Sequence, residues 1–222
     1  MDKSRKFWRR EAVVAALFLI LGLSAQGSET DAVDTLCAER PASIDDAPVA
    51  EVAGFYRVDR DHSKLKFCVS RIPFSEVEGE FGSFAGEFTI PKHSLEATQL
   101  RVAIRPESVD TGNKLINSVV TGEQFFGVKE HPEIRFKSTS IQLTGENVAR
   151  LTGDLTLRGK TRPVSFNVYF VFDPFKPGST ERGVSFEGGF EISRSEFGMD
   201  SLTGVVGDKV RICLSARAYR VE

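Results

Sequence analysis

The chain has 222 residues, a formal net charge of −2 and 18 phenylalanines against a single tryptophan. This length suits one domain with a sizeable hydrophobic core. Because 29 basic residues are balanced by 31 acidic ones, the chain offers no basic domain and nucleic acid is not an expected partner.

The first 25 residues have the pattern of a secretory signal peptide. Five basic residues within the first ten precede the apolar run AVVAALFLILGL and the small-residue stretch SAQG, which is the order of a cleaved leader. The run is shorter than the ~20 residues that a membrane span needs, and an uncleaved anchor is the alternative. We therefore expect cleavage after Ala25 and export to the bacterial periplasm. Residues 26–54 are acidic and lack periodicity, which indicates a flexible segment.

From Phe55 onward, apolar and polar residues alternate, as is typical of half-buried β-strands. A fault in this alternation between Phe81 and Phe84 predicts a bulge near Gly82 and Ser83. Glycines with inward parity, such as Gly153 and Gly188, have no side chain, which favours a hollow interior over a filled one. The alternation predicts eight strands, over residues 56–71, 76–90, 98–107, 133–143, 147–158, 161–173, 183–194 and 207–221.

The segment 111–134 interrupts the β pattern between the third and fourth predicted strands. Leu115, Val119 and Val120 can share one helical face, Gly122 can end that helix, and EQFFGV can form a second short turn. We therefore predict an all-β fold, an extended eight-stranded antiparallel lipocalin-like barrel with a short helical cap between strands three and four.

The three cysteines leave one thiol over if a disulfide forms. Cys68 and Cys213 both have the parity of outward-facing residues on the first and last strands, so these two can pair if the strands are neighbours. The alternatives are three free thiols, or a bond through Cys37 that ties down the N-terminal segment.

Seven motifs occur in an order that resembles the YceI-like family of lipid- and polyisoprenoid-binding proteins. They are YRVDRDHSKLKFCV, GEFGSFAGEF, SVDTGN, EQFFGVKEHPEIRFKST, LTGDLTLRGKTRPV, ISRSEFGMD and VGDKVRICL. The resemblance covers residues 55–222, which are expected to form one domain. It implies a barrel around an apolar tunnel for a polyisoprenoid chain, such as a prenyl pyrophosphate or an isoprenoid quinone. The chain departs from the family pattern at Arg71, where a His is usual, and in VVTGEQFF, which replaces an aspartate-rich approach to the double Phe.

Two arginines end inward apolar rows at the same rim of the predicted barrel. Strands one, three, five and seven run toward that rim, so Arg71 and Arg194 would place positive charge inside its mouth. A buried guanidinium needs a partner. For Arg194 this is either an anionic or polar ligand head, or an acidic side chain of the protein, namely Glu78, Glu196, Asp200 or Asp208.

The inward rows and the cap supply the expected ligand-binding residues. Phenylalanines on these rows can either line a tunnel or fill an eight-stranded barrel completely, and a filled barrel would suit a protein-interaction module. A tunnel could also carry a fatty acid or amide. The expected ligand-binding residues are Arg71, Arg194, Phe67, Val69, Phe84, Phe88, Leu115, Val119, Phe125, Phe126, Phe136, Phe166, Phe170, Phe186, Phe190 and Ile192.

The sequence gives no signal of catalysis. His62, His93 and His131 lack the paired spacing of metal ligands, and there is no nucleophile-elbow motif. We expect no catalytic residue, metal or cofactor. The expected partner is a long-chain isoprenoid or acyl lipid, with transient contact to a membrane surface or membrane protein, and a homodimer as a further option.

Overall fold

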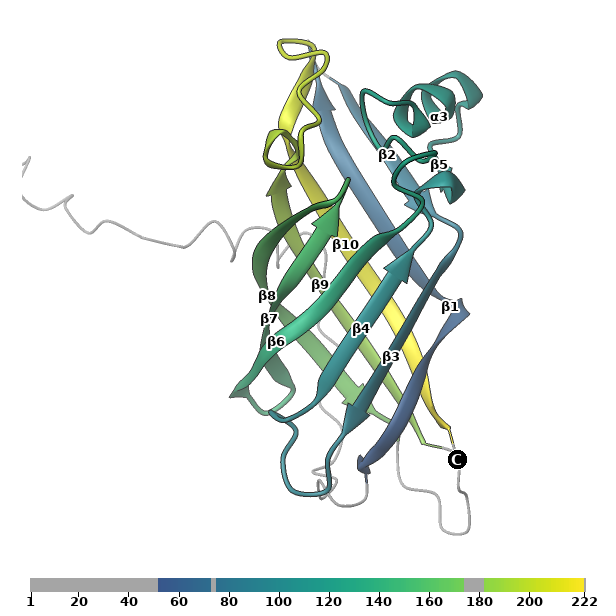
Figure 1. Cartoon of the computed structure of the whole chain (residues 1–222). Coiled ribbons are helices and arrows are strands. Elements are labelled where there is room, and N and C mark those ends of the chain that lie inside the picture. Colours follow the sequence, from purple (N-terminus) through teal and green to yellow (C-terminus); the bar gives the residue numbers. More distant parts are fainter. Residues whose placement is uncertain (1–51, 73–74, 174–181, 222) are drawn as a thin grey trace, which may run out of the picture.

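The computed structural model describes residues 52–72, 75–173 and 182–221 (Figure 1). The predicted signal peptide lies outside the described residues, as does nearly all of the predicted flexible segment. The strands are β1 (Gly54–Arg71), β2 (Ser75–Phe81), β3 (Phe84–Ile90), β4 (Gln99–Ile104), β5 (Val109–Asp110), β6 (Ile134–Gly145), β7 (Val148–Leu157), β8 (Lys160–Phe172), β9 (Gly183–Ser193) and β10 (Val206–Val221).

The strands form a closed antiparallel barrel, which confirms the predicted fold. The sheet order is β10-β9-β8-β7-β6-β4-β3-β1-β2-β5, and an additional pairing of β10 with β1 closes the circle. The wall has eight strand positions, because β2 and β3 share one position beside β1 and the two-residue β5 only extends β2. Closure leaves the barrel without a long exposed edge.

The predicted strand 76–90 consists of two strands, β2 and β3. The interruption between them lies at Gly82 and Ser83, where the bulge was expected. At the break, the Gly82 and Ser83 amides donate to the Ser108 carbonyl (3.1 Å) and the Ser108 hydroxyl (2.9 Å). Ser108 belongs to the short 3₁₀ helix η1 (Pro106–Ser108). Pro106 has no amide to continue the β4 ladder, so β4 ends earlier than the predicted 98–107.

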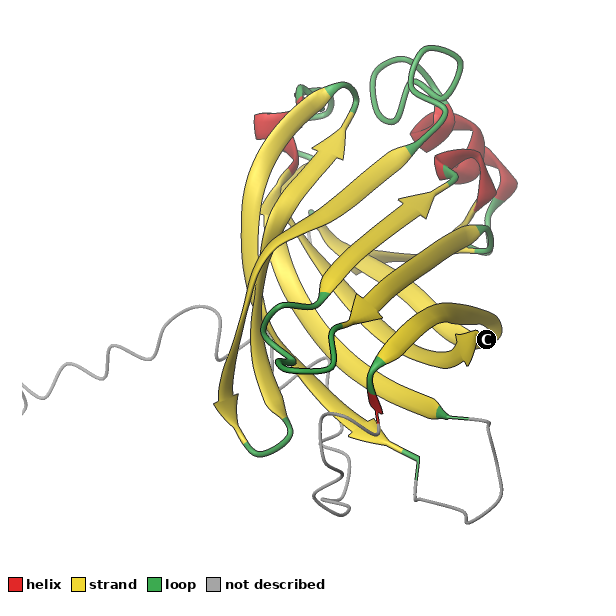
Figure 2. Cartoon of the chain, turned by 60° about the horizontal axis from the view of Figure 1, so that its bottom comes forward, coloured by secondary structure: helices red, strands yellow, loops and turns green. Residues whose placement is uncertain are grey.

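The odd-numbered strands of the prediction do run toward one rim, which we call the upper rim. There the Ile72 amide donates to the Val205 carbonyl at 2.9 Å, and Arg158 Nη1 donates to the Gly198 carbonyl at 2.7 Å. Helix α3 (Lys114–Thr121) lies at the same rim (Figure 1). Figure 2 shows the helical segments around α3 and several loops at this end.

The opposite end, called the lower end, contains a second cluster of packed side chains. Tyr56 is fully buried there, stacks on Phe88 with ring centroids 4.9 Å apart, and donates its hydroxyl to the Val52 carbonyl at 2.8 Å. Burial raises the pKa of Tyr56, although the charges of Arg220 and Arg182 oppose this shift. The hydroxyl therefore stays protonated and keeps its donor role.

The structure excludes a Cys68–Cys213 disulfide, which was one of the options that the sequence left open. Cys68 carries a free thiol, whereas Cys213 is disulfide-bonded. The strands are neighbours as expected, but in the register Cys68 lies opposite Arg211 and Cys213 lies opposite Lys66, so the two cysteines are not directly cross-strand. Cys37, the remaining cysteine, lies outside the described residues.

Candidate functional site

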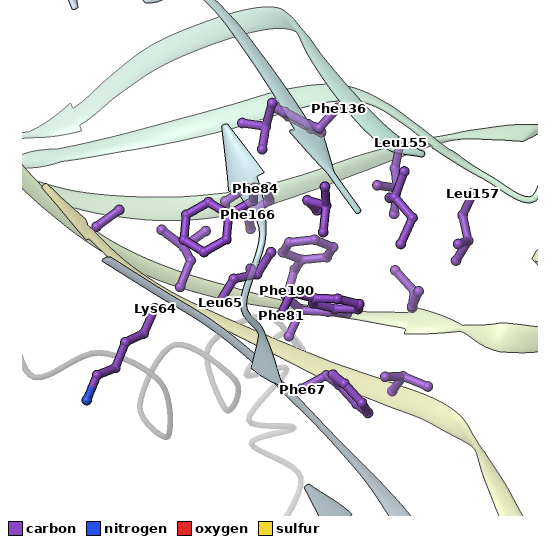
Figure 3. A pocket seen from close by; sticks show the side chains of 18 of the residues that line it. Lys64, Leu65, Phe67, Phe81, Phe84, Phe136, Leu155, Leu157, Phe166 and Phe190 are labelled. Atoms are coloured by element: carbon purple, nitrogen blue, oxygen red, sulfur yellow. The ribbon is translucent and has the colours of Figure 1, made fainter. Parts of the chain in front are cut away.

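The interior of the barrel is hollow. A cavity of about 650 Å³ extends from the packed lower end to the upper rim, within the roughly 300–1,000 Å³ of ordinary small-molecule sites. Almost all of its exposed wall is apolar, and Figure 3 shows aromatic side chains from several strands converging on it. The structure therefore has a tunnel rather than the filled core that the sequence left open.

Side chains that point into the barrel remain partly uncovered, which is the local sign of the cavity. Leu65, Phe84, Leu100, Val102 and Phe190 all line the interior, yet each is only half-buried. In a solid core such residues would be fully covered by neighbours. Their uncovered surface faces the cavity and is available to an apolar ligand.

Phenylalanines follow one another along the wall in ring contacts. Phe166 stacks on Phe190 with centroids 4.6 Å apart and meets Phe136 at 6.1 Å. On the other side Phe81 lies 5.5 Å from Phe67 and 5.7 Å from Phe126 of the cap. Neighbouring rings therefore support one another along the wall.

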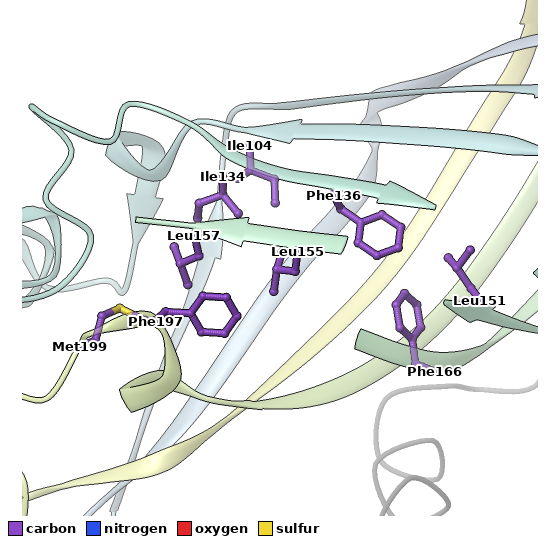
Figure 4. Packing of buried hydrophobic residues seen from close by; sticks show 9 residues of the cluster. All are labelled: Ile104, Ile134, Phe136, Leu151, Leu155, Leu157, Phe166, Phe197 and Met199. Carbon is purple, nitrogen blue, oxygen red and sulfur yellow. The ribbon is translucent and has the colours of Figure 1, made fainter. Parts of the chain in front are cut away.

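The packed part of the wall lies on the β6–β7 side near the upper rim. Ile134, Phe136, Leu155 and Leu157 form a cluster there with Phe197 (Figure 4). Phe197 comes from η2 (Arg194–Phe197), the 3₁₀ turn after β9. Ile134, Phe136, Leu155 and Leu157 also line the cavity, so this cluster forms one packed side of its wall.

The inward glycines do not create the cavity. A Cβ on Gly153 would lie 2.4 Å from Cζ of Phe136 and 2.5 Å from the Lys137 carbonyl, and one on Gly188 would lie 2.7 Å from the Asn167 carbonyl. Neither glycine lines the cavity. The expectation that they provide ligand space is wrong, because their room is taken by the Phe136 ring and by neighbouring backbone.

Every residue that the sequence assigned to ligand binding lines the cavity. Parity alone placed the strand residues correctly, because alternate side chains of a strand point to opposite faces. The same signal would also have found inward residues left out of that set, such as Leu100, Val102 and Leu155. Contact with a ligand stays a prediction for all of them.

Arg194 is held by main-chain carbonyls. The side chain is 3% exposed. Nε donates to the Gly207 carbonyl (2.8 Å) and Nη2 to the Val206 carbonyl (3.0 Å), while Nη1 donates to the carbonyls of Ser201 (2.8 Å) and Met199. These hydrogen bonds go to main-chain carbonyls and not to the expected carboxylates, and contact of Arg194 with a ligand head stays a prediction. Arg194 fastens the connection between η2 and β10, and four of the five guanidinium N–H groups are used there.

Asp208, one of the acidic partners expected for Arg194, instead caps η2. Its Oδ1 accepts the Ser195 amide at 3.0 Å. Burial opposes ionisation, but hydrogen bonds from Ser195 and Ser193 together with the charge of Arg194 lower the pKa of Asp208. The carboxylate is therefore ionised near neutral pH and supports the rim electrostatically.

The charged residues at the cavity wall are all basic among the described residues. They are Lys64, Arg71 and Arg194. Arg71 is exposed at the upper rim, and its Nε donates to the Ser75 hydroxyl at 3.1 Å. Lys64 reaches away from the aromatic side chains (Figure 3). The mouth therefore favours an anionic group beside Arg71 rather than a cation.

The cap is anchored by aromatic residues and presents aliphatic ones. Phe125 is buried with its ring 6.0 Å from the Arg194 guanidinium carbon. Asn113 is the N-cap of helix α3, and its side chain accepts the amides of Leu115 (2.9 Å) and Ile116 (3.3 Å). Leu115 lines the mouth and is nevertheless 79% exposed.

The connection from η2 to β10 supplies cavity residues that the sequence analysis missed. Leu202 and Val205 line the mouth and are about half exposed. Leu202 adopts a left-handed backbone conformation, with φ 57°, which is uncommon for a bulky side chain. No periodic pattern marks this segment, and its position depends on the distant hydrogen bonds of Arg194.

Within the described parts of the chain, no three His, Cys, Asp or Glu side chains are grouped so that they could hold a metal ion. None of the helices described is long and apolar enough to cross a membrane.

Comparisons with known proteins agree on one family. A model of the YceI-like domain matches residues 56–218. A UPF0312 protein of Ectopseudomonas mendocina is 30% identical over 171 residues, which are 76% of this chain and 89% of the relative. Among solved structures, Burkholderia cenocepacia BcnA superposes with a TM-score of 0.63 at 26% identity, covering 72% of this chain and 98% of BcnA.

A second structural neighbour is described as a polyisoprenoid binding domain from Saccharophagus degradans implicated in plant cell wall breakdown. It superposes with a TM-score of 0.59 at 15% identity and covers 75% of this chain and 98% of that domain. At this identity the likeness concerns the fold.

Proposed function

Because the chain belongs to the YceI-like domain family, we propose that it is an exported binding protein that carries a polyisoprenoid or similar long-chain lipid in its barrel cavity. The observation that carries this proposal is the apolar cavity of about 650 Å³ whose charged wall residues are all basic. The apolar wall suits a hydrocarbon tail, and the basic mouth suits a diphosphate or a polar quinone head. The description of the S. degradans domain supports the choice of ligand class.

Export to the periplasm is part of the proposal and is supported by the basic, apolar and small-residue order of residues 1–25. We assign binding rather than catalysis, because the cavity wall is almost entirely apolar and, among the described residues, its charged groups are basic without an acidic partner in the wall.

The tail would supply most of the affinity. Burying ~20 ligand carbons at roughly 0.8 kcal/mol each gives on the order of 16 kcal/mol, before the costs of association and ordering. A charge-assisted contact between the head and Arg71 would add about 1.5–3 kcal/mol. The tail would therefore hold the ligand, and the head would fix which end faces the mouth.

Binding of defined probes to the purified mature protein tests the proposal. The probes are geranylgeranyl diphosphate, an isoprenoid quinone and palmitate, and native mass spectrometry with organic extraction identifies any lipid that copurifies. We expect one prenyl ligand per protein. If none of these probes binds and no lipid copurifies, the proposal is wrong. Binding of palmitate alone would replace the isoprenoid by an acyl lipid.

A blocking variant shows whether the cavity is the site. Val102→Phe adds a ring inside the cavity and should weaken prenyl binding at least about tenfold. Ala103→Phe places the same ring on the outer face of β4 and is the matched control. Equal affinities for the two variants would locate the ligand elsewhere.

Orientation of the ligand can be tested through its head. Arg71→Gln should weaken geranylgeranyl diphosphate by roughly ten- to a hundredfold and leave the uncharged alcohol geranylgeraniol unchanged. Arg101→Gln, on the exposed outer face of β4, should affect neither. If Arg71→Gln weakened the binding of both ligands, Arg71 would shape the mouth without contacting the diphosphate head.

A further inference from the structure

Of the seven exposed aliphatic residues among those that the structure describes, five gather around the cavity mouth, while Leu143 and Val221 lie at the lower end. Ile72 is 61% exposed and Leu115 79% exposed, and Val119, Leu202 and Val205 are each about half exposed. These five residues come from the end of β1, from α3 and from the η2–β10 connection, all at the upper rim (Figures 1 and 2). We call them the apolar collar. An apolar group of this kind on a rim marks an interaction surface.

The protein holds the collar in place by specific interactions. The Asn113 side chain accepts two amides at the start of α3, and Arg194 donates to carbonyls on both sides of Leu202. The Ile72 amide donates to the Val205 carbonyl at 2.9 Å, which joins two parts of the collar directly. These hydrogen bonds fix the backbone of all three segments that carry the collar residues.

Four collar residues, all except Ile72, also line the cavity. The exposed surface is consequently continuous with the interior wall. A hydrocarbon tail that leaves the cavity through this mouth passes directly over the collar. Any tail that entered water there would lose the favourable burial that holds it in the barrel.

From this continuity we propose that the collar docks on a lipid bilayer, so that the ligand passes between membrane and cavity without crossing water. The inference rests on the proposed lipid-binding function and names the surface from which that ligand is exchanged. Short aliphatic side chains around a mouth can enter the boundary between headgroups and acyl chains.

The charges beside the collar are mixed in sign. Arg71 and Glu76 flank Ile72, and Asp110 and Lys114 flank the start of α3. The described residues that flank these two collar segments in sequence contain no basic run of the kind that selects anionic lipids. Docking should therefore depend on apolar contact, and neutral phosphatidylcholine vesicles should suffice.

Cosedimentation of the mature protein with phosphatidylcholine vesicles tests docking. We expect binding that changes little between low and high salt. The double variant Ile72→Ser/Leu115→Ser should lower the partition coefficient at least about tenfold. Val221→Ser, a change at an apolar residue of the lower end that is 36% exposed, should stay within about twofold of wild type. Absence of vesicle binding, or equal loss in both variants, would overturn the docking surface.

The rate of lipid uptake separates docking from ligand affinity. Uptake of a fluorescent prenyl lipid from donor vesicles should accelerate with vesicle concentration and should slow severalfold in Ile72→Ser, whose side chain does not line the cavity. An uptake rate independent of vesicle concentration would mean transfer through water and would overturn the inference.

Two further measurements show whether a negative result contradicts the proposed lipid binding or only the proposed membrane docking. Titration of soluble geranylgeranyl diphosphate without vesicles reports on the cavity alone, so intact titration with absent vesicle binding removes only the docking surface. Sedimentation velocity reports on a second copy of the chain, and a dimer that Ile72→Ser/Leu115→Ser dissociates would show that the collar binds protein instead of membrane.

Discussion

The two ends of the barrel carry similar apolar residues but differ in whether these residues are buried. At the lower end, Tyr56, Phe88 and Val184 bury their side chains against one another. At the upper rim, the side chains of Leu115 and Leu202 are exposed to solvent, although hydrogen bonds hold the backbone at Leu115 and at Ser201 beside Leu202. Apolar surface covered by the protein itself contributes stability, whereas apolar surface left uncovered around a cavity is available for binding.

The largest stability effect is expected at the lower end. Tyr56→Ala removes a fully buried ring and should lower the free energy of unfolding by roughly 3–5 kcal/mol, measured by urea denaturation. Tyr56→Phe keeps the stack on Phe88 and loses only the hydrogen bond to Val52, so it should cost about 1 kcal/mol. If Tyr56→Ala cost no more than Tyr56→Phe, the lower end would not be the stabilising end.

At the upper rim, the matching test is Arg194→Lys. The variant keeps the charge but cannot reach four carbonyls with one ammonium, and we expect a loss of roughly 2–3 kcal/mol from the orphaned acceptors. Hydrogen exchange should accelerate at Val205 and Val206, while protection at the lower end stays. Arg101→Lys on the outer face is the control. Unchanged exchange in the η2–β10 connection would contradict the fastening role of Arg194.

Between the two ends, Gly153→Ala tests how tightly the wall is packed. The new methyl group would meet the Phe136 ring and the Lys137 carbonyl, so we expect a loss of roughly 1–3 kcal/mol by thermal or urea unfolding. Gly145→Ala has its nearest neighbour at 3.7 Å and should change little. Similar values for both would mean that the Phe136 ring moves aside at no cost.

The smallest effect concerns pH at the upper rim. The lowered pKa of Asp208 means that its ionised form stabilises the fold above the unfolded pKa of about 3.9, and this contribution disappears as pH falls through the folded value. Because Asp208 is exposed, the gain should be at most about 0.5 kcal/mol. The stability difference between wild type and Asp208→Asn should therefore shrink from pH 7 to pH 3, and a constant difference would contradict this.

Several particular residues show where reading the sequence succeeded and where it failed. Phe166 and Phe190 were placed on the inner face by parity, and the break at Gly82 and Ser83 was found from a fault in the same parity. Cys68 and Cys213 were also given the correct strands, but their pairing depended on a register that alternation does not specify. The predicted partners of Arg194 were all side chains or ligands, because carbonyls of a distant connection leave no mark in the sequence.

The sequence by itself determined which residues face inward, how many strand positions close the barrel and which rim carries the cap, since these follow from the two-residue repeat of a strand and the order of elements along the chain. Only the tertiary structure decided that the interior is hollow, that Gly153 makes room for Phe136 and that Leu202 stands at the mouth. These features depend on how far apart eight strands hold their side chains and on contacts between segments remote in sequence, and no local pattern encodes either.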